Sequence, residues 1–524
     1  MKALLVTARL AETAVRSHAL ESKVETMVVT LPVPVAALLT PELIARHLST
    51  MNLTGYDLIL IPGLVRGDAE IIEEVCAIPT FKGPRYSADI PTVLNTLEEV
   101  RLSKTEPADK VLRQTLKQQV TLQLRKAEDD RDDLLKRPGN FLIGDVPIGR
   151  GFPMRVMAEI LDAPTLSDRE IQSRAQYYVE SGAKIIDIGM MAGNPKPKEA
   201  SRAVKAVKSL SLAPIAIDTF DIEEAKAAIG AGADLLLSLD ASSMVEATSF
   251  AREVAVVILP MDNRGGYSPK EPQARAETLT RNVSKARALG YKRIIADPVA
   301  DPLITPGLTA SIVCYHLFSH RHPDVPLLLG AGNITELLDA DSVGVNALLG
   351  GIAAEVDASL LLTTEGSDKT LGAVRELSIA SKMMFLAKKR PSVPKDLGFD
   401  LLILKEKRCL EEPYEGGPDE EARAIEAKPV SEEHLDPAGS YRIMIDRSKG
   451  HIVATRFVGA AQGEIVKGGD AASIYGTLID MGLVTRLDHA AYLGRELAKA
   501  EIALKLGRSY IQDQPLFSKN GDKE

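Results

Sequence analysis

Short apolar runs alternate with amphipathic helical stretches between residues 140 and 390. Each run has the length of a buried strand, and each is followed by ten or more residues whose apolar positions recur at helical spacing. Eight such strand–helix units predict a (β/α)8 TIM barrel, with a doubly wound open sheet as the alternative. The predicted strands are residues 155–161, 184–189, 214–219, 233–239, 254–260, 293–298, 325–330 and 357–363.

The first 139 residues show two other patterns. Residues 1–105 contain β-rich runs separated by helical patterns, which predicts a small N-terminal α/β domain. Residues 106–139 are highly charged and poor in Gly and Pro, and their apolar positions follow a helical period. We expect one long helical linker there, with its charges on a solvated face.

Residues 391–524 predict a small C-terminal α+β domain. Residues 411–429 are rich in Glu, Pro and Gly and indicate a surface linker or mobile loop. Residues 440–457 read as two strands joined in a hairpin, and residues 487–507 read as a helix that ends at Gly507.

Composition and charge narrow the classes of partner. The chain has 524 residues and a net charge of −9, which argues against a general nucleic-acid binder. No apolar run is long enough to span a membrane, and the N-terminal stretch is too short for a signal peptide. The three cysteines are far apart and form no metal or disulfide pattern, so a cytoplasmic location is expected.

Polar residues end every predicted strand of the barrel. The carboxyl ends of barrel strands meet at the active face, so these side chains should form one polar cup. Taken singly, Asp162, Asp187 and Asp297 could each equally be a loop residue, a helix cap or a paired structural residue. Together they offer many acceptors and few bases, which suits a ligand with several N–H donors, such as an aminopyrimidinone ring. The residues at these ends include Glu159, Asp162, Asp187, Asp218, Ser238, Asp240, Asp262, Asn263, Arg264, Asp297, Asn333, Thr364, Glu365, Ser367 and Lys369.

The order of these motifs resembles the pterin-binding barrel superfamily. The stretches "KIIDIG", "IAIDTFDIEEAKAAIGAGAD", "VVILPMDNRGG", "IIADP" and "LLGAGN" carry the resemblance over about residues 154–390. This superfamily includes dihydropteroate synthase and methyltransferases that act on methylated tetrahydropterins. The three-part organisation is similar to dihydropteroate synthase-like proteins of organisms that use tetrahydromethanopterin.

The resemblance implies roles for individual residues. Asp218 would bind the N–H edge of the pterin ring, Asp297 would bind its 2-amino and N3 groups, and Asp187 would support the site from the second strand. Asn333 would lie beside the pterin N5. Arg264 corresponds to an arginine in the fifth-strand loop of the synthases. Asp162 stands where both groups have Asn, and it is the candidate Mg²⁺ ligand of a synthase-type transferase.

Three departures from the synthase pattern bear on the chemistry. Leu237 stands where the synthases have a ring-binding Asn, so Ser238 or Asp240 would replace that contact. The seventh strand ends in "GAGNIT", closer to the methyltransferases than to the Ser-Arg-Lys of the synthases. The eighth ends in "TTEGSDKT", where Lys369 is the only base in place of an Arg-x-His.

Three functions stay open at this point. The favoured one is a transferase that condenses a dihydropterin pyrophosphate with an arylamine, with Arg264, Lys369 and Mg²⁺ stabilising the leaving group. The second is methyl transfer from a methylated tetrahydropterin, with Asn333 acting at N5. The third is a pterin-binding carrier without catalysis. The alternatives for a protein partner are a second copy of the chain, which would form a homodimer, and another protein of the same pathway.

Overall fold

The computed structural model describes residues 1–98, 100–389, 393–395, 397–407, 423–427 and 435–517. The chain divides into two compact units, Met1–Pro413 and Tyr414–Glu524. Among the described residues, no helix is both long and apolar enough to cross a membrane. Most of the expected linker at residues 411–429 lies outside the described residues.

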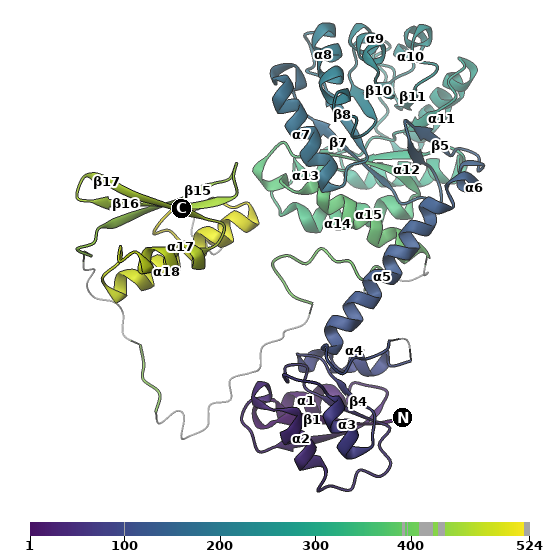
Figure 1. Cartoon of the computed structure of the whole chain (residues 1–524). Coiled ribbons are helices and arrows are strands. Elements are labelled where there is room, and N and C mark those ends of the chain that lie inside the picture. The colour runs from purple at the N-terminus through teal and green to yellow at the C-terminus, as the bar shows by residue number, and fades with distance from the viewer. Residues whose placement is uncertain (99, 390–392, 396, 408–422, 428–434, 518–524) are drawn as a thin grey trace. The chain divides into compact units, whose positions relative to one another are not determined.

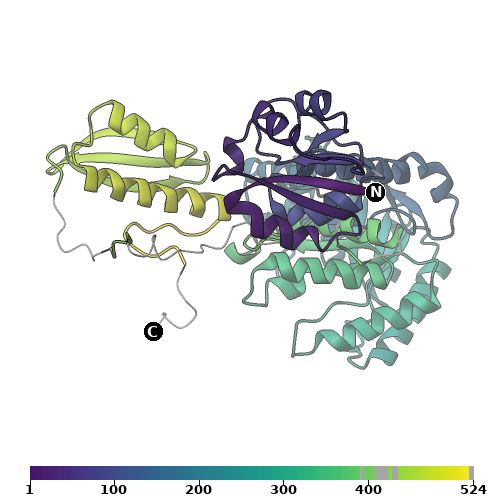
Figure 2. The ribbon, with the colours of Figure 1, turned by 90° about the horizontal axis from the view of Figure 1, so that it is seen from below.

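A four-stranded parallel sheet with the order β2-β1-β3-β4 begins the first unit. Helices α2 and α3 pack on one of its faces, and α1 and α4 pack on the other (Figure 2). Strand β4 was not expected, since it has three residues and follows a proline. The strands are β1 (Lys2–Ala8), β2 (Glu25–Leu31), β3 (Leu58–Ile61) and β4 (Thr80–Lys82), and the helices are α1 (Glu12–Ala19), α2 (Pro41–Leu48), α3 (Glu70–Cys76) and α4 (Ile90–Asn95).

The predicted long linker helix is present but interrupted. Helix α5 covers Ala108–Asp129 and α6 covers Arg131–Leu135, with Asp130 at the break. Near the end of α5, Glu128 accepts two hydrogen bonds from the guanidinium of Arg155, at 2.7 and 3.1 Å. Arg155 is the first residue of β7, so this ion pair fixes the end of α5 against the barrel.

Eight parallel strands close into a barrel, which confirms the predicted fold (Figure 1). The strands are β7 (Arg155–Ile160), β8 (Ile185–Gly189), β9 (Ile215–Asp218), β10 (Leu235–Leu239), β11 (Ala255–Ile258), β12 (Ile294–Ala296), β13 (Leu327–Gly330) and β14 (Ala358–Thr364). The helices around them are α7 (Asp168–Ser181), α8 (Pro197–Lys208), α9 (Ile222–Ala231), α10 (Ser243–Glu246), α11 (Pro272–Ala288), α12 (Leu308–Arg321), α13 (Gly332–Thr335), α14 (Ser342–Glu355) and α15 (Ala373–Lys389).

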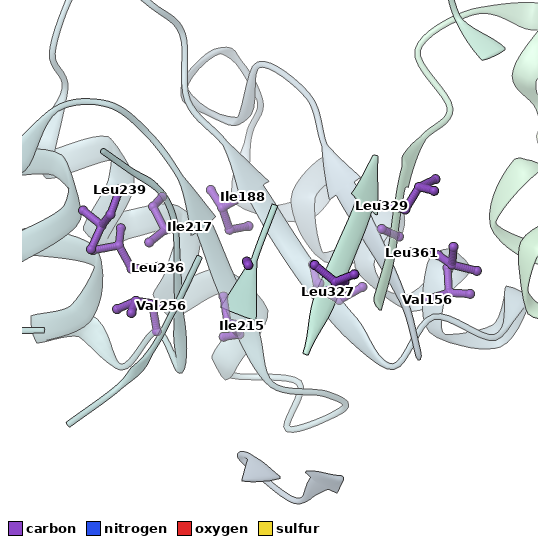
Figure 3. Close-up of a cluster of buried hydrophobic side chains, with 14 of the residues drawn as sticks. Val156, Ile188, Ile215, Ile217, Leu236, Leu239, Val256, Leu327, Leu329 and Leu361 are labelled. Atoms are coloured by element: carbon purple, nitrogen blue, oxygen red, sulfur yellow. The ribbon is translucent and has the colours of Figure 1, made fainter. Parts of the chain in front are cut away.

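Alternate residues of the strands build two separate apolar layers. Val156, Ile188, Ile217 and Leu329 belong to the layer between strands and helices, part of which is drawn in Figure 3. The residues of opposite parity fill the inside of the barrel. Those inside residues include Met157, Ile185, Ala216, Leu235, Leu237, Val257, Ile295, Leu328 and Leu360.

A short hairpin closes the amino end of the barrel. Strands β5 (Phe141–Ile143) and β6 (Val146–Ile148) pair antiparallel, and Ile143, Val146 and Ile148 pack against the inside layer. The Arg293 guanidinium donates to the carbonyl oxygen of Leu142 at 3.3 Å. The hairpin therefore acts as a floor, and the polar strand ends lie at the opposite, carboxyl end.

The second unit is an antiparallel sheet with the order β15-β16-β17, with two helices packed on one face (Figure 1). The predicted hairpin corresponds to β15 (Ser440–Asp446) and β16 (His451–Val458); β17 (Ala461–Gly468) extends it. The helices are α17 (Ala471–Asp480) and α18 (Leu487–Leu506). Gly507 ends α18 in a left-handed conformation with φ +70°, as the sequence predicts.

Candidate functional site: a carboxylate cluster at the barrel mouth

The carboxylates at the mouth continue the inside layer of the barrel. Glu159 follows Met157 by two residues, and Asp187 follows Ile185 in the same way. The same spacing relates Asp218 to Ala216 and Asp297 to Ile295. Side chains two apart in a strand point to the same face, so all four carboxylates point into the barrel, directly above its apolar filling.

Three of these carboxylates form one cluster. Glu159 pairs with Asp187 in the register of β7 and β8, and Asp218 pairs with Gly189 in the register of β8 and β9. One oxygen from each of Glu159, Asp187 and Asp218 lies within 4.8 Å of the other two. The fold brings Glu159 to the centre of the site, although the sequence analysis assigned it no role beyond its place at a strand end. The signal that could have found it is its position two residues after Met157, which places both side chains on the inward face of the same strand.

Asp187 is the deepest member of the cluster. It is fully buried, and neither of its carboxylate oxygens has a hydrogen-bond partner among the described residues. Burial, followed by the charges of Asp218 and Glu159, raises its pKa well above the usual range. The Ile188 N–H opposes this rise without reaching hydrogen-bond geometry.

The other two carboxyl groups of the cluster also have raised pKa values. Burial, with the charges of Asp218 and Asp162, raises the pKa of Glu159 to about 7. Burial likewise raises the pKa of Asp218, and the Ser238 hydroxyl opposes it by donating to Asp218 Oδ1 at 2.6 Å. Like charges in a dry pocket cannot all ionise without compensation.

A distortion of β10 directs Ser238 toward Asp218. The pairing of β10 with β11 shifts register between Leu236 and Leu239, and Ser238 has φ +70°. Leu236 and Leu239 both pack outward, although they are three residues apart. The irregularity therefore turns Ser238 inward at the position next to Leu237, as bulges near active sites commonly do.

Asp297 lies at the end of β12 in a fixed orientation. Its Oδ1 accepts from the Val299 N–H at 2.7 Å and from the Tyr315 hydroxyl at 2.9 Å. Burial raises the pKa of Asp297 to about 6, while these two donors oppose the rise. Asn333 is exposed and donates to the Ala300 carbonyl at 3.1 Å, which joins the loops after β12 and β13.

The remaining predicted site residues lie further from the cluster or are engaged locally. Asp240 is buried and accepts from the N–H groups of Ser242, Ser243 and Asn263, so it fixes the turn into α10. Arg264 is largely exposed and forms an ion pair with Glu246. Lys369 forms an ion pair with Asp339 at 2.8 Å.

Asp162 follows β7 in a left-handed conformation and is exposed. Its backbone carbonyl accepts from Thr165, and its charge contributes to the raised pKa of Glu159. Asp162 therefore lies near the cluster without belonging to it. An oxygen-rich site of this kind fits Mg²⁺ by ligand type, with Glu159, Asp187 and Asp218 as the closer set of donors.

The resemblance noted from the sequence is supported by known proteins. A family model described as "Pterin binding enzyme" matches residues 162–342. A protein of Methanocaldococcus jannaschii, described as uncharacterized, is 39% identical over 529 residues, covering 99% of each chain. The chain belongs to the dihydropteroate synthase-like family of pterin-binding TIM-barrel proteins.

Two further family models match the N- and C-terminal parts of this pterin-binding protein, and solved dihydropteroate synthases are similar to part of the chain. Residues 2–85 match a family of unknown function (DUF6513), and residues 435–513 match the family PterinBD-DUF4346. The dihydropteroate synthase of Xanthomonas albilineans is 20% identical, with a TM-score of 0.38, and covers 49% of this chain and 100% of its own. The Thermus thermophilus synthase in complex with 6HMPPP is 20% identical, with a TM-score of 0.37, and covers 46% of this chain and 97% of its own.

Proposed function

We propose that the barrel mouth binds a reduced pterin and that the protein is a transferase of the dihydropteroate synthase kind. It would condense a dihydropterin pyrophosphate with an arylamine in folate or tetrahydromethanopterin biosynthesis. The observation that carries this proposal is the placement of Asp218 and Asp297 as inward-facing carboxylates above an apolar floor, with the buried Asp187 beside Asp218.

The hydrogen bonds already made leave acceptors for the ring. Asp297 Oδ1 is occupied by Val299 and Tyr315, so its Oδ2 is directed to a ligand. Asp218 Oδ1 is occupied by Ser238 in the same way. The guanidine-like edge of a pterin presents parallel N–H donors, which carboxylates accept strongly. Asp297 would take the 2-amino and N3 groups, and Asp218 would take a second N–H edge.

Departure of pyrophosphate requires positive charge at the mouth. The sequence predicts Arg264 and Lys369 as the positively charged side chains. In the structure, Arg264 forms an ion pair with Glu246, and Lys369 forms one with Asp339. Both pairs are partly exposed and are therefore weak, so exchange for a polyanion costs little. A Mg²⁺ ion on the carboxylate side would add to this charge when bound.

Methyl transfer is the second candidate, and Asn333 is the observation that favours it. Its amide is exposed, and its Nδ2 is held by the carbonyl of Ala300 in the loop that follows Asp297. This hydrogen bond uses the amide nitrogen and leaves the amide oxygen available to a ligand. An amide there can hydrogen-bond a protonated pterin N5, which methyl transfer requires.

Calorimetric titration of the full-length protein tests the proposal. The titrants are 7,8-dihydropterin pyrophosphate and tetrahydromethanopterin, each with and without Mg²⁺. We expect wild type to bind, and Asp218→Asn and Asp297→Asn to weaken binding by at least about tenfold, or roughly 1.4 kcal/mol. Asp145→Asn, in the exposed turn of the floor hairpin, is the matched control.

The pattern of binding separates the candidates. Magnesium-dependent binding of the pyrophosphate, followed by product formation with an arylamine, supports the synthase reaction. Binding of the complete tetrahydropterin alone supports methyl transfer. Wild-type affinity in both Asp→Asn variants would refute the assignment of this site.

A further inference from the structure

Among the residues that the structure describes, none compensates the charge of the cluster formed by Glu159, Asp187 and Asp218. Within the part of the chain that the structure describes, no Lys or Arg forms an ion pair with any of the three carboxylates. The two oxygens of Asp187 are buried and have no partner. An unpaired buried carboxylate is costly, and native proteins neutralise such groups with a proton, a donor or a cation.

The spacing of the three oxygens suits a metal ion. Oxygen ligands of Mg²⁺ and Ca²⁺ lie about 2.0–2.6 Å from the ion, so two ligands on opposite sides are separated by about 4–5 Å. The three oxygens here lie within 4.8 Å of one another. Neighbouring ligands around one ion lie about 3–4 Å apart, so the three side chains would close in by about 1–2 Å at most as the ion binds.

Gly189 makes room for the third ligand. A Cβ atom at this position would lie 2.3 Å from Glu159 Oε1. Gly189 is the last residue of β8, and the Glu159 carboxylate lies directly over its Cα. The absent side chain thus lets Glu159 lie against β8, within reach of Asp187 and Asp218.

We propose that Glu159, Asp187 and Asp218 form a binding site for one divalent cation, Mg²⁺ or Mn²⁺. The oxygen-only ligand set favours these hard ions over zinc or copper. Asp187 anchors the ion from below, and Glu159 and Asp218 hold it from the neighbouring strands. The Ser238 hydroxyl uses only one lone pair of Asp218 Oδ1, so Asp218 can give one oxygen to the ion and keep an acceptor for the pterin ring.

The role of the ion rests on the proposed function, although its binding does not. A cation on this wall of the mouth would supply positive charge beside the pterin, where Arg264 and Lys369 are occupied by acidic partners. The ligand set differs from the sequence-based expectation, which placed the metal at Asp162.

Manganese titration of the full-length protein tests the site. Protein freed of metal with EDTA and then desalted is titrated with Mn²⁺ at about pH 8, and free Mn²⁺ is followed by electron paramagnetic resonance. We expect one bound ion that Mg²⁺ displaces. Glu159→Gln and Asp187→Asn should each weaken binding by at least about tenfold. Glu253→Gln, an exposed residue paired with Lys292, is the matched control.

The outcomes are independent of pterin binding. No Mn²⁺ bound by wild type at millimolar concentration, or unchanged binding in Glu159→Gln, overturns the inference. Pterin binding in EDTA by a protein that binds no Mn²⁺ would leave the proposed function standing without the metal site. Mn²⁺ binding without pterin binding would do the reverse. Thermal unfolding of each variant confirms that it is folded.

Discussion

The phenolic hydroxyl of Tyr315 lies 2.9 Å from Oδ1 of Asp297 and also 2.9 Å from the carbonyl oxygen of Leu328. Its single proton can satisfy only one of these acceptors at a time. When it is directed to Asp297, it favours the ionised carboxylate and opposes the rise in pKa caused by burial. A buried residue on α12 thus influences the charge of a residue that faces the mouth.

Replacement of Tyr315 by Phe should raise the pKa of Asp297 further above about 6. The ionised form of Asp297 accepts the pterin N–H groups. As pH is lowered, the variant should therefore lose pterin affinity at a higher pH than wild type does. Calorimetric titration across the pH range measures this midpoint. Tyr291→Phe removes another buried hydroxyl, which donates to the Met244 carbonyl at 2.6 Å, and is the control. The same midpoint in both variants would contradict the role of Tyr315.

Ser238 offers a test that separates a hydrogen bond from backbone conformation. Both Ser238→Ala and Ser238→Gly remove the donor to Asp218, so each should weaken pterin binding by a few fold, in keeping with about 1 kcal/mol for one hydrogen bond. Only Gly accepts the left-handed φ of +70° without strain, so Ser238→Gly should be the more stable of the two. Equal affinity of Ser238→Ala and wild type would show that the bond to Asp218 does not contribute.

The metal-free barrel should respond to pH in a direction fixed by its raised carboxyl groups. Asp297 has a pKa of about 6 in the folded chain, against an ordinary value of 3.8. Between these values the folded state binds more protons than the unfolded state, so this group's contribution to the free energy of unfolding falls as pH rises. The Asp297→Asn variant removes that dependence.

We therefore expect the stability of Asp297→Asn relative to wild type to rise between about pH 4 and about pH 6 and to level off above that. Thermal unfolding in EDTA measures the difference in stability between variant and wild type, in which titrating groups that do not interact with Asp297 cancel. Asp145→Asn, in the exposed turn of the floor hairpin, is the control. A gain in stability of Asp297→Asn that shrinks with rising pH would show that the pKa of Asp297 is not raised in the folded chain.

Gly189→Ala should disturb the carboxylate cluster without unfolding the barrel. The new Cβ would meet only the end of the flexible Glu159 side chain, which can turn away. We expect Mn²⁺ affinity to fall by about tenfold, as in Glu159→Gln. Gly344→Ala is the control, because Gly344 lies in α14 with open space around its Cα, and the exchange should leave Mn²⁺ affinity unchanged. Wild-type Mn²⁺ affinity in Gly189→Ala would show that the Glu159 carboxylate does not bind the ion at this position.

Much of the barrel was predictable because its strands are apolar, of ordinary length and separated by regular helices. All eight were found, and the predicted residues Asp187, Asp218 and Asp297 lie at the ends of three of them. The floor hairpin escaped prediction because its strands have three residues each and one contains Pro147. The break at Asp130 was missed because the surrounding charges keep a helical period on both sides.

The arrangement of the site was harder to predict than its composition. Glu159 appears as one polar strand end among many, and only the closed barrel brings it against Asp187 and Asp218. The inward turn of Ser238 depends on an irregularity in pairing between β10 and β11, which no local pattern announces. Likewise, the partners of Arg264 and Lys369 come from other loops, so their engagement appears only in three dimensions.

The hairpin formed by β5 and β6 blocks the amino end of the barrel, so a ligand can enter the interior only from the carboxyl end. A molecule that rests on the carboxylates nearest the filled interior cannot leave through the amino end, where Ile143, Val146 and Ile148 are packed. Whatever arrives second must lie above it and depart before it. A sequential order of addition, with the deeper ligand first in and last out, is therefore a consequence of this plug.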